Sequence, residues 1–286
     1  MLLLAACSVF LFAACAHGSS LHGARNAPQA QAAGQLSIQV NDDRLTLAAA
    51  GVPQVYLYGV IDADAPRRVE ALIRSWKIPR GSDVYLNAAG GDVNAGLALG
   101  RLFRAGSIVT HLGTPRRTLR TRSIAKDALC ADACAYAYFG GLYRWAPTGK
   151  DRIGVHRLSA MDAKPTGNDS TAPGPVAIAA YLKDMGIQAS ALAQSPVTPR
   201  EQIAWLDADQ MMATGLANNG RLPLTSTYQM SSGMPALTLN QIVRNGVNRV
   251  TIICRPDGLT LTSYYIVGSD RARKVVGHAA RSFFEV

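Results

Sequence analysis

The stretch DVYLNAAGGDVNAGLAL, residues 83–99, decides the fold of this chain. DVYLN is a short apolar run typical of a buried strand, and residues 92–104 have the apolar spacing of a helix that ends at Gly106. Gly90 and Gly91 lie between the two elements. Glycines at such a turn either permit a tight bend or let backbone N–H groups point at an anion or a carbonyl oxygen.

The same alternation continues on both sides of this stretch. QVYLYGVI (residues 54–61) is a predicted strand, followed by a helix that begins near Asp64 and Pro66. SIVTHL (residues 107–112) is a third strand. The order strand, helix, strand, helix, strand predicts right-handed crossovers and an α/β fold with a mainly parallel sheet.

Less regular segments surround this core. QLSIQV and DRLTLA alternate like the arms of a hairpin around Asn41 and Asp42, and residues 248–267 indicate a hairpin around Pro256, Asp257 and Gly258. Residues 198–201 form a capping box, and Asp207 begins another predicted helix. We expect an α/β domain over residues 35–221, a linker over 222–236 and a small α+β domain over 237–286.

Composition limits the functional classes. The chain has 286 residues, 48% of them hydrophobic and 17% charged, which is typical of a globular protein with a sizeable core. Its 29 basic and 19 acidic residues give a net charge of +10. The basic cluster RRTLRTR (residues 116–122) has no alternating aromatic residues, so it favours a solvated loop over a phosphate or lipid contact. No nucleic-acid partner is expected.

The first residues indicate an export signal. The apolar run within MLLLAACSVFLFAACAHGSS is shorter than the ~20 apolar residues that a membrane span needs. Ala13, Ala14 and Cys15 resemble the lipobox of bacterial lipoproteins, which implies an acylated Cys15 and membrane anchoring; the alternative is a secretory signal cut near Ala16. We expect a signal peptide over residues 1–14, a flexible tether over 15–34, and location in the periplasm or cell envelope.

An exported chain would keep three cysteines in an oxidising compartment: Cys130, Cys134 and Cys254. Cys130 and Cys134 are close enough to be bridged if the chain bends at the helix start, although spacing alone does not determine connectivity. A CxxxC pattern without companion ligands is weak evidence for a metal, so we assign no metal and no cofactor.

Two further segments carry candidate site residues. In CADACAYAYFGG (residues 130–141), Asp132 opens an apolar helix, where the amide of Ala133 is also free of helical bonding. In IGVHR, His156 ends a predicted strand.

Taken in order, these segments resemble the Clp-type peptidase and crotonase superfamily, and more closely exported bacterial proteins with a Clp-protease-like domain. VYLNAAGGDVNAGLAL is similar to the family element NSPGGsVtaGlai, and CADACAYAYFGGLYRWAPTGKDRIGVHR to CxSACxxxxxxGxxR…iGvHr. The resemblance extends from about Gln54 to Asn218. It implies a spiral of βα units and a homo-oligomer.

The resemblance also implies site roles. The amides of Gly91 and Ala133 would form an oxyanion hole, His156 would be the general base, and Asp132 occupies the position of the nucleophilic serine. Gly90, Cys130 and Cys134 would support this turn. The third triad position, an acid in the family, falls on Ile203, with Glu201 and Asp207 nearby.

The carboxylate of Asp132 changes the expected chemistry. Attack by a carboxylate on a peptide would give a mixed anhydride prone to collapse, and its charge would oppose an oxyanion. We expect the helix N-terminus to hold Asp132 ionised as a cap, and the carboxylate to favour imidazolium at His156. Both effects disfavour peptidase chemistry.

Several functional hypotheses remain open at this point. The first is a pseudopeptidase that binds an extended peptide or an envelope protein by strand addition without cutting it. The second is a crotonase-like enzyme in which Asp132 and His156 form an acid–base pair. A residual serine-type hydrolase is a third. In the last hypothesis, the C-terminal domain binds a partner, and the large domain only presents the C-terminal domain.

Overall fold

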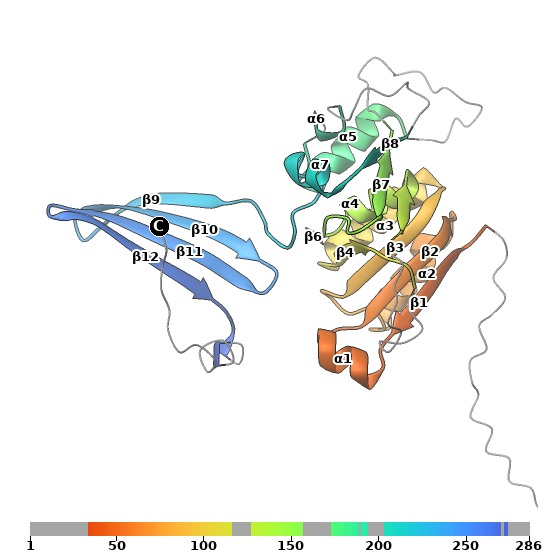
Figure 1. Cartoon of the computed structure of the whole chain (residues 1–286), viewed down its shortest axis with the longest axis horizontal. Helices are drawn as coiled ribbons and strands as arrows, with labels where there is room; N and C mark the ends of the chain where they lie inside the picture. The colour runs from red at the N-terminus through yellow and green to blue at the C-terminus, as the bar shows by residue number, and fades with distance from the viewer. Residues whose placement is uncertain are drawn as a thin grey trace, which may run out of the picture. The chain divides into compact units, whose positions relative to one another are not determined.

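The computed structural model describes residues 34–115, 127–156, 173–188, 190–193, 203–269 and 272–273. They form an α/β body, here the described residues from 34 to 221, and a separate antiparallel sheet, here called the C-terminal sheet (Figure 1). The predicted fold class, a mixed α/β fold with a mainly parallel sheet, is confirmed. No described helix is both long enough and apolar enough to span a membrane.

An eight-stranded sheet forms the centre of the α/β body. Its strands are β1 (Leu36–Asn41), β2 (Gln54–Ile61), β3 (Asp83–Gly91), β4 (Val109–Leu112), β5 (Leu129–Ala131), β6 (Tyr143–Arg144), β7 (Arg152–Val155) and β8 (Ala204–Leu206). The main order is β1-β2-β3-β5-β7-β8, and only β1 and β8 run antiparallel to their neighbours in this described sheet.

Strand β3 is the branch point of the sheet. Its first half, Asp83–Leu86, pairs with β4, whereas Ala88 pairs with Cys130 of β5. The carboxyl ends of β3, β5 and β7 therefore lie at one edge of the body. In parallel sheets this is the edge where ligands bind.

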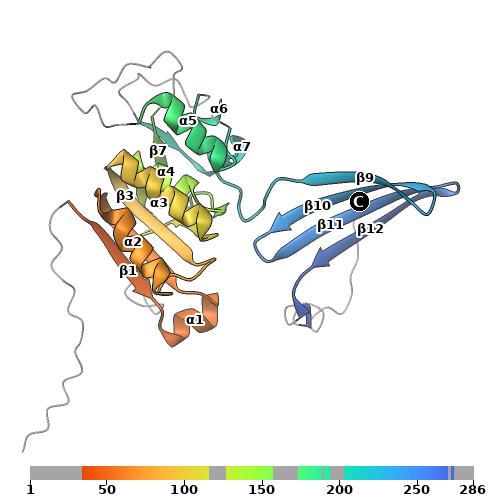
Figure 2. The same ribbon diagram turned by 180° about the vertical axis from the view of Figure 1, so that it is seen from behind.

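The α/β body also contains helices. They are α1 (Arg44–Ala50), α2 (Ala65–Arg74), α3 (Val93–Ala105), α4 (Ala133–Phe139), α5 (Pro175–Asp184), α6 (Ser190–Ala193) and α7 (Ala208–Ala213). In Figure 2, α2 and α3 lie side by side in front of the strands. Val55 and Leu57 of β2 are buried in the same core as Val69 of α2 and Leu99 of α3, as the alternation of a strand dictates.

Close helix contact depends on glycines in α3 and at the end of α4. A Cβ added to Gly96 would lie 2.3 Å from the carbonyl oxygen of Ala133, and one added to Gly140 would lie 2.1 Å from the carbonyl oxygen of Gly100. A side chain at either glycine would separate the helices. The packing thus sets the position of Ala133, the first residue of α4.

The expected hairpin around Asn41 and Asp42 is wrong. Residues 44–50 form helix α1 instead of a strand, and β1 pairs with β2. The carboxylate of Asp43 accepts hydrogen bonds from the amides of Leu45 and Thr46, and Gly51 ends the helix with a φ of 74°. These two caps outweigh the alternating pattern.

The C-terminal sheet contains β9 (Thr225–Ser231), β10 (Met234–Val243), β11 (Gly246–Arg255) and β12 (Gly258–Ile266), in the order β12-β11-β10-β9, with all neighbours antiparallel. The predicted hairpin around Pro256, Asp257 and Gly258 is confirmed by β11 and β12. Strand β9 lies within residues 222–236, which were expected to be a linker, so the sheet begins earlier than expected.

Several predicted features lie outside the described residues. They are the signal peptide with Cys15, all of the tether except residue 34, the basic cluster at 116–122, the capping box at 198–201 and the residues after 273.

Candidate functional site

The site is built around a sharp turn between β5 and α4. Its central residue, Asp132, has φ 48° and ψ −113°, a conformation that residues with side chains rarely adopt. The Asp132 amide donates to the carbonyl oxygen of Gly154 at 3.2 Å, and the Tyr136 amide donates to the carbonyl oxygen of Asp132 at 3.1 Å. Hydrogen bonds on both sides thus hold the strained turn in place.

A disulfide encloses this turn. Cys130 and Cys134 are bonded to each other, and both are fully buried. The two cysteines stand two residues before and two residues after Asp132. The sequence placed them within bridging distance without assigning the pair, and the structure assigns it.

His156 is brought to Asp132 by the sheet. It follows β7 directly, and Gly154 of β7 pairs with Ala131 of β5. The distance from His156 Nε2 to Asp132 Oδ1 is 2.9 Å, and 43% of the His156 side chain and 26% of the Asp132 side chain are exposed to solvent. The two candidate residues therefore lie within ion-pair distance of each other and are open to solvent on one side.

Burial shifts the pKa of Asp132. Desolvation raises the pKa of Asp132 above its usual value, although the nearby His156 acts in the opposite direction. The expected capping role is wrong: within the described residues, the Asp132 side chain caps no amide of α4. Its carboxylate lies 2.9 Å from His156 Nε2 instead.

The two glycines take different places beside this pair. Gly90 has φ 143°, and a Cβ there would lie 3.7 Å from Asp132 Oδ2, so the backbone of β3 passes close to the carboxylate. Gly91 has φ 137°, but its close contact is with Ile61, whose carbonyl oxygen would lie 2.1 Å from an added Cβ. As the first residue of α4, Ala133 has an amide without an intrahelical acceptor. The oxyanion roles of Gly91 and Ala133 stay predictions.

The position of the third triad member lies beside His156. Strands β7 and β8 are antiparallel with Val155 opposite Ala204, and continuing this register sets Ile203 opposite His156. The nearby carboxylate of Asp207 caps α7 by accepting from the Gln210 amide. Glu201 lies outside the described residues. The described neighbour of His156 at this position is therefore apolar.

Two apolar side chains near His156 were not foreseen. Trp205 stands opposite Gly154 and Leu129 opposite Arg152, on the sheet face that His156 continues, and each is 41% exposed. Only their exposure in the folded chain distinguishes them from core residues, so the sequence held no signal for them.

Arg144 aligns with the Arg of the motif CxSACxxxxxxGxxR but was given no role from the sequence. It is 4% exposed, and its guanidinium donates to the carbonyl oxygens of Gly141, Gly215 and Leu216. Burial lowers the pKa of Arg144 to about 10. The arginine thus fixes the segment after α4 to the segment after α7.

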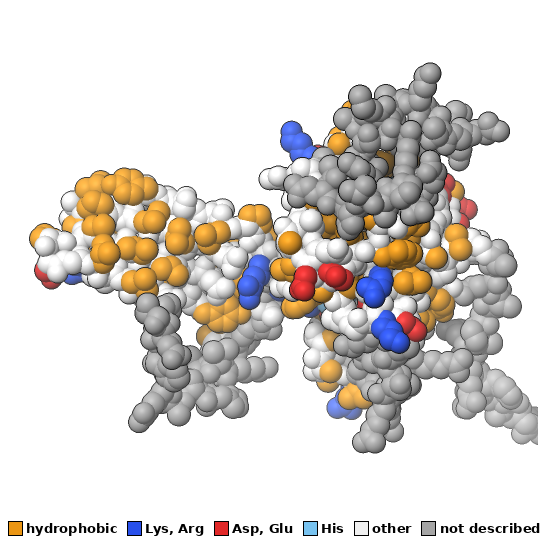
Figure 3. Space-filling view, turned by 45° about the horizontal axis from the view of Figure 1, so that its top comes forward, with side chains coloured by type: hydrophobic (Ala, Val, Ile, Leu, Met, Phe, Trp, Pro, Cys, Tyr) orange, Lys and Arg blue, Asp and Glu red, His pale blue; other side chains and the backbone are white. Residues whose placement is uncertain are grey.

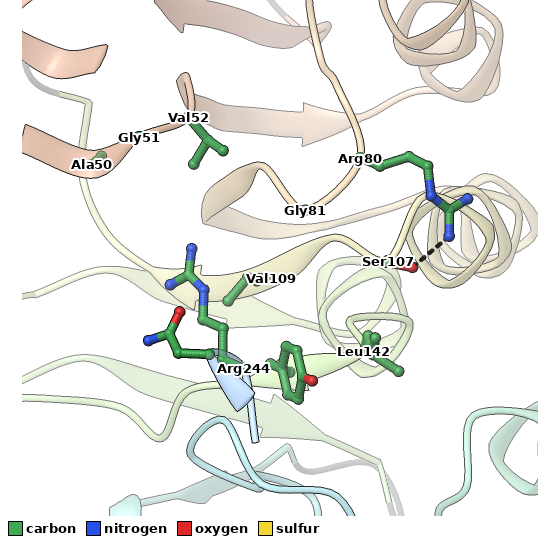
Figure 4. A pocket seen from close by; sticks show the side chains of 11 residues that line it. Ala50, Gly51, Val52, Arg80, Gly81, Ser107, Val109, Leu142 and Arg244 are labelled. Atoms are coloured by element: carbon green, nitrogen blue, oxygen red, sulfur yellow. Dashed lines mark hydrogen bonds between the residues drawn. The ribbon is translucent and has the colours of Figure 1, made fainter. Parts of the chain in front are cut away.

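A pocket lies at the amino ends of the parallel strands, away from Asp132 and His156. It has a volume of about 480 Å³, and it is lined by residues that precede or begin β2, β3 and β4, such as Val52, Gly81 and Val109. Figure 4 shows Arg80 directed at Ser107, to which it donates a hydrogen bond of 2.7 Å. Since His156 and Asp132 lie at the carboxyl ends of the strands, this pocket is not part of their site. Within the described ranges, no group of three or more His, Cys, Asp or Glu residues is arranged to hold a metal ion.

Comparisons with known proteins concern the fold. No protein-family model and no curated protein matches the chain. Among solved structures, a ClpP1 mutant from Listeria monocytogenes is 14% identical with a TM-score of 0.37, covering 60% of this chain and 93% of that one. A mutant of the 1510-N membrane-bound stomatin-specific protease, in complex with a substrate peptide, is 16% identical with a TM-score of 0.37, covering 57% and 71%.

Proposed function

We propose that this protein is a pseudopeptidase, which binds an extended peptide or protein segment and does not cleave it. The observation that carries the proposal is the 2.9 Å contact between His156 Nε2 and Asp132 Oδ1. In serine peptidases this imidazole nitrogen receives the proton of the attacking hydroxyl. Here the carboxylate of Asp132 lies where that hydroxyl would be.

The chemistry of a carboxylate supports binding without cleavage. Attack by Asp132 on a peptide carbonyl would form an anhydride, which is less stable than the ester that a serine forms. The Asp132 Oδ2 lies 3.7 Å from the position of a Cβ added to Gly90, next to Gly91. An ionised Asp132 would therefore also repel an oxyanion developing at the predicted Gly91 and Ala133 amides. The pair can hold a ligand but is poorly suited to breaking it.

Exposed groups near the pair suit an extended ligand. Strand β8 is at the edge of the described sheet, and its Trp205 is exposed beside Gly154. A peptide that adds to this edge would gain backbone hydrogen bonds and place alternate side chains against Trp205. We further propose, from the N-terminal sequence, an exported protein of the periplasm or cell envelope anchored through Cys15, and a homo-oligomer from the resemblance.

Restoring the nucleophile tests the proposal. We expect Asp132→Ser to gain labelling by a serine-reactive phosphonate, because the serine hydroxyl would face His156 Nε2. The double variant Asp132→Ser with His156→Ala is the matched control, and it should lose the labelling. The wild type should not be labelled. A wild type that is labelled, or that releases peptide fragments, would contradict the proposal.

A second function is favoured by the raised pKa of Asp132, which burial causes. A carboxyl group of raised pKa beside an imidazole can exchange a proton with a ligand, as an acid–base enzyme requires. Deuterium exchange at the α-carbon of small acyl compounds would reveal this activity. If it occurs and is abolished by both Asp132→Asn and His156→Ala, the enzyme hypothesis replaces the pseudopeptidase.

A further inference from the structure

The two faces of the C-terminal sheet differ in composition, although the threonine face described below also carries Ile242, Ile253, Tyr264 and Ile266. The row Tyr228, Leu237, Ile252 and Leu261 crosses all four strands in direct register on one face. The adjacent row, one residue along each strand, consists of Thr227, Thr238, Thr251 and Thr262 and lies on the other face. Such alternation is typical of a sheet that buries one face and exposes the other.

The described residues leave the apolar face exposed. We define it by Tyr228, Met230, Leu237, Ile252, Leu259 and Leu261, of which Leu259 is 73% exposed and Leu261 53% exposed. In the described sheet only Ala236 is buried among the hydrophobic residues. Figure 3 shows hydrophobic side chains gathered over the lobe that β9–β12 form. A sheet with one apolar face is stabilised by packing that face against another element.

We propose that the apolar face packs against the same face of a second copy of this chain, forming a two-sheet sandwich. This interface goes beyond the proposed peptide binding and does not depend on it. Two identical apolar faces can be buried together without a complementary partner, because a two-fold interface uses the same patch on both subunits.

The size of the face fits a stable dimer. The four strands are 7, 10, 10 and 9 residues long. At ~4.8 Å between strands and ~3.4 Å per residue, the face measures about 600 Å², so two copies would bury roughly 1,200 Å², the lower end of stable interfaces.

The distribution of charge favours a second copy over a membrane. The charged residues of the described strands β9–β12 are Arg249 and Arg255, and both lie on the threonine face by register. A lipid-binding face of this size would be expected to carry Lys or Arg at its rim to reach anionic headgroups. The absence of charge among the described residues of the apolar face also removes local repulsion between copies of a chain whose net charge is +10.

The test measures the self-association of the full chain by sedimentation equilibrium. We expect a monomer–dimer equilibrium that strengthens with added salt, because salt screens repulsion between basic copies. Leu261→Lys should weaken association at least about tenfold, since a lysine would be buried without a partner. Thr262→Lys, its neighbour on the other face of β12, should leave the association constant within about twofold.

Two further measurements locate the contact. Tyr228→Lys and its control Thr227→Lys repeat the comparison on β9, in case Leu261→Lys perturbs folding. Cys254 is exposed and lies on the strand next to Leu259. Its alkylation, followed by peptide mass spectrometry, should slow as wild-type concentration rises and should not slow in Leu261→Lys.

Three results would overturn the proposal. The first is a wild type that stays monomeric at every concentration. The second is self-association that Leu261→Lys and Tyr228→Lys leave unchanged, which would place the contact elsewhere. The third is flotation of the wild type, but not of Leu261→Lys, with vesicles of phosphatidylglycerol and phosphatidylcholine, which would make a membrane the occupant of the face.

Discussion

At the scale of single residues, Asp132 combines two unfavourable conditions. Its φ of 48° is strained for a residue with a side chain, and its carboxylate is held away from water, which raises its pKa. The bond to Gly154 and the disulfide of Cys130 and Cys134 hold the turn against this strain. Strain that the surrounding structure maintains is concentrated at sites that act on a ligand.

Replacing this charge should stabilise the protein in a pH-dependent way. Because the folded-state pKa of Asp132 is raised, ionisation costs folding free energy, so the wild type is penalised as pH rises through that pKa. We expect Asp132→Asn, which keeps a residue tolerant of positive φ, to raise the Tm at pH 7. The gain should shrink below about pH 4, where a carboxyl group is protonated in both states.

Thermal unfolding at pH 7 and at acidic pH measures this effect. Asp127→Asn is the control, because Asp127 is exposed and its removal should change the Tm little. A lower Tm for Asp132→Asn at pH 7 would show that the contact with His156 stabilises the fold more than burial of the carboxylate costs.

At the scale of elements, the site depends on the contact between α3 and α4. A Cβ at Gly96 would meet the carbonyl oxygen of Ala133 at 2.3 Å, next to the turn at Asp132. Because the Ala133 carbonyl oxygen belongs to the backbone and cannot rotate away, the clash with a Cβ at residue 96 can be relieved only if the helices move apart.

Gly96→Ala should therefore lower the free energy of unfolding by about 2–3 kcal/mol and weaken ligand binding at the site. Urea unfolding measures the first effect. Gly174→Ala is the matched control, because a Cβ there would have no heavy atom within 4 Å. Equal stability of the two variants would mean that α4 can shift without cost.

Local signals predicted the elements whose ends carry their own caps. Asp92 begins α3 and Asp207 begins α7, as the sequence indicated. In the structure Asp92 accepts from the Ala95 amide, and Asp207 forms a capping box with Gln210. The alternation of residues 43–48 predicts a strand, but the Asp43 cap makes them part of helix α1. The Thr and Ser residues around β9 are typical of a linker, but they form a strand. Cap and turn chemistry is local, whereas the choice of strand partner is not.

The candidate site was predicted in part for the same reason. The order of motifs brought Asp132 and His156 together, and the structure joins them at 2.9 Å. The direction of the Asp132 side chain was not predictable, because it follows from the backbone conformation of the turn. The burial of Arg144 and the exposure of Trp205 depend on segments far apart in the sequence, such as those joined by the Arg144–Leu216 bond with its separation of 72.

At the scale of the whole molecule, a buried carboxylate links the α/β body to the C-terminal sheet. Asp83 begins β3 and is bonded at 2.9 Å to His111 of β4 and at 2.8 Å to Arg244 in the turn between β10 and β11. Only 7% of the Asp83 side chain and 26% of the Arg244 side chain are exposed. The amide of Arg244 also donates to the carbonyl oxygen of Gly220. Loss of Arg244 would leave a charge that His111 alone must compensate.

Arg244→Gln should lower the free energy of unfolding by about 3 kcal/mol at pH 7, because breaking a buried ion pair strands its partner. Arg249→Gln is the control: Arg249 is exposed, bonds to Asn240 within the C-terminal sheet, and its replacement should change stability by less than about 0.5 kcal/mol.

Burial acts to raise the pKa of Asp83, but hydrogen bonds from His111 and Arg244 outweigh it and lower that pKa. The stabilisation is thus present above the ordinary carboxyl pKa and is lost as pH falls below it, so the difference between wild type and Arg244→Gln should narrow below about pH 4. Denaturant unfolding across this pH range measures the difference, and equal losses for Arg244→Gln and Arg249→Gln would show that Asp83 does not couple the two parts of the chain.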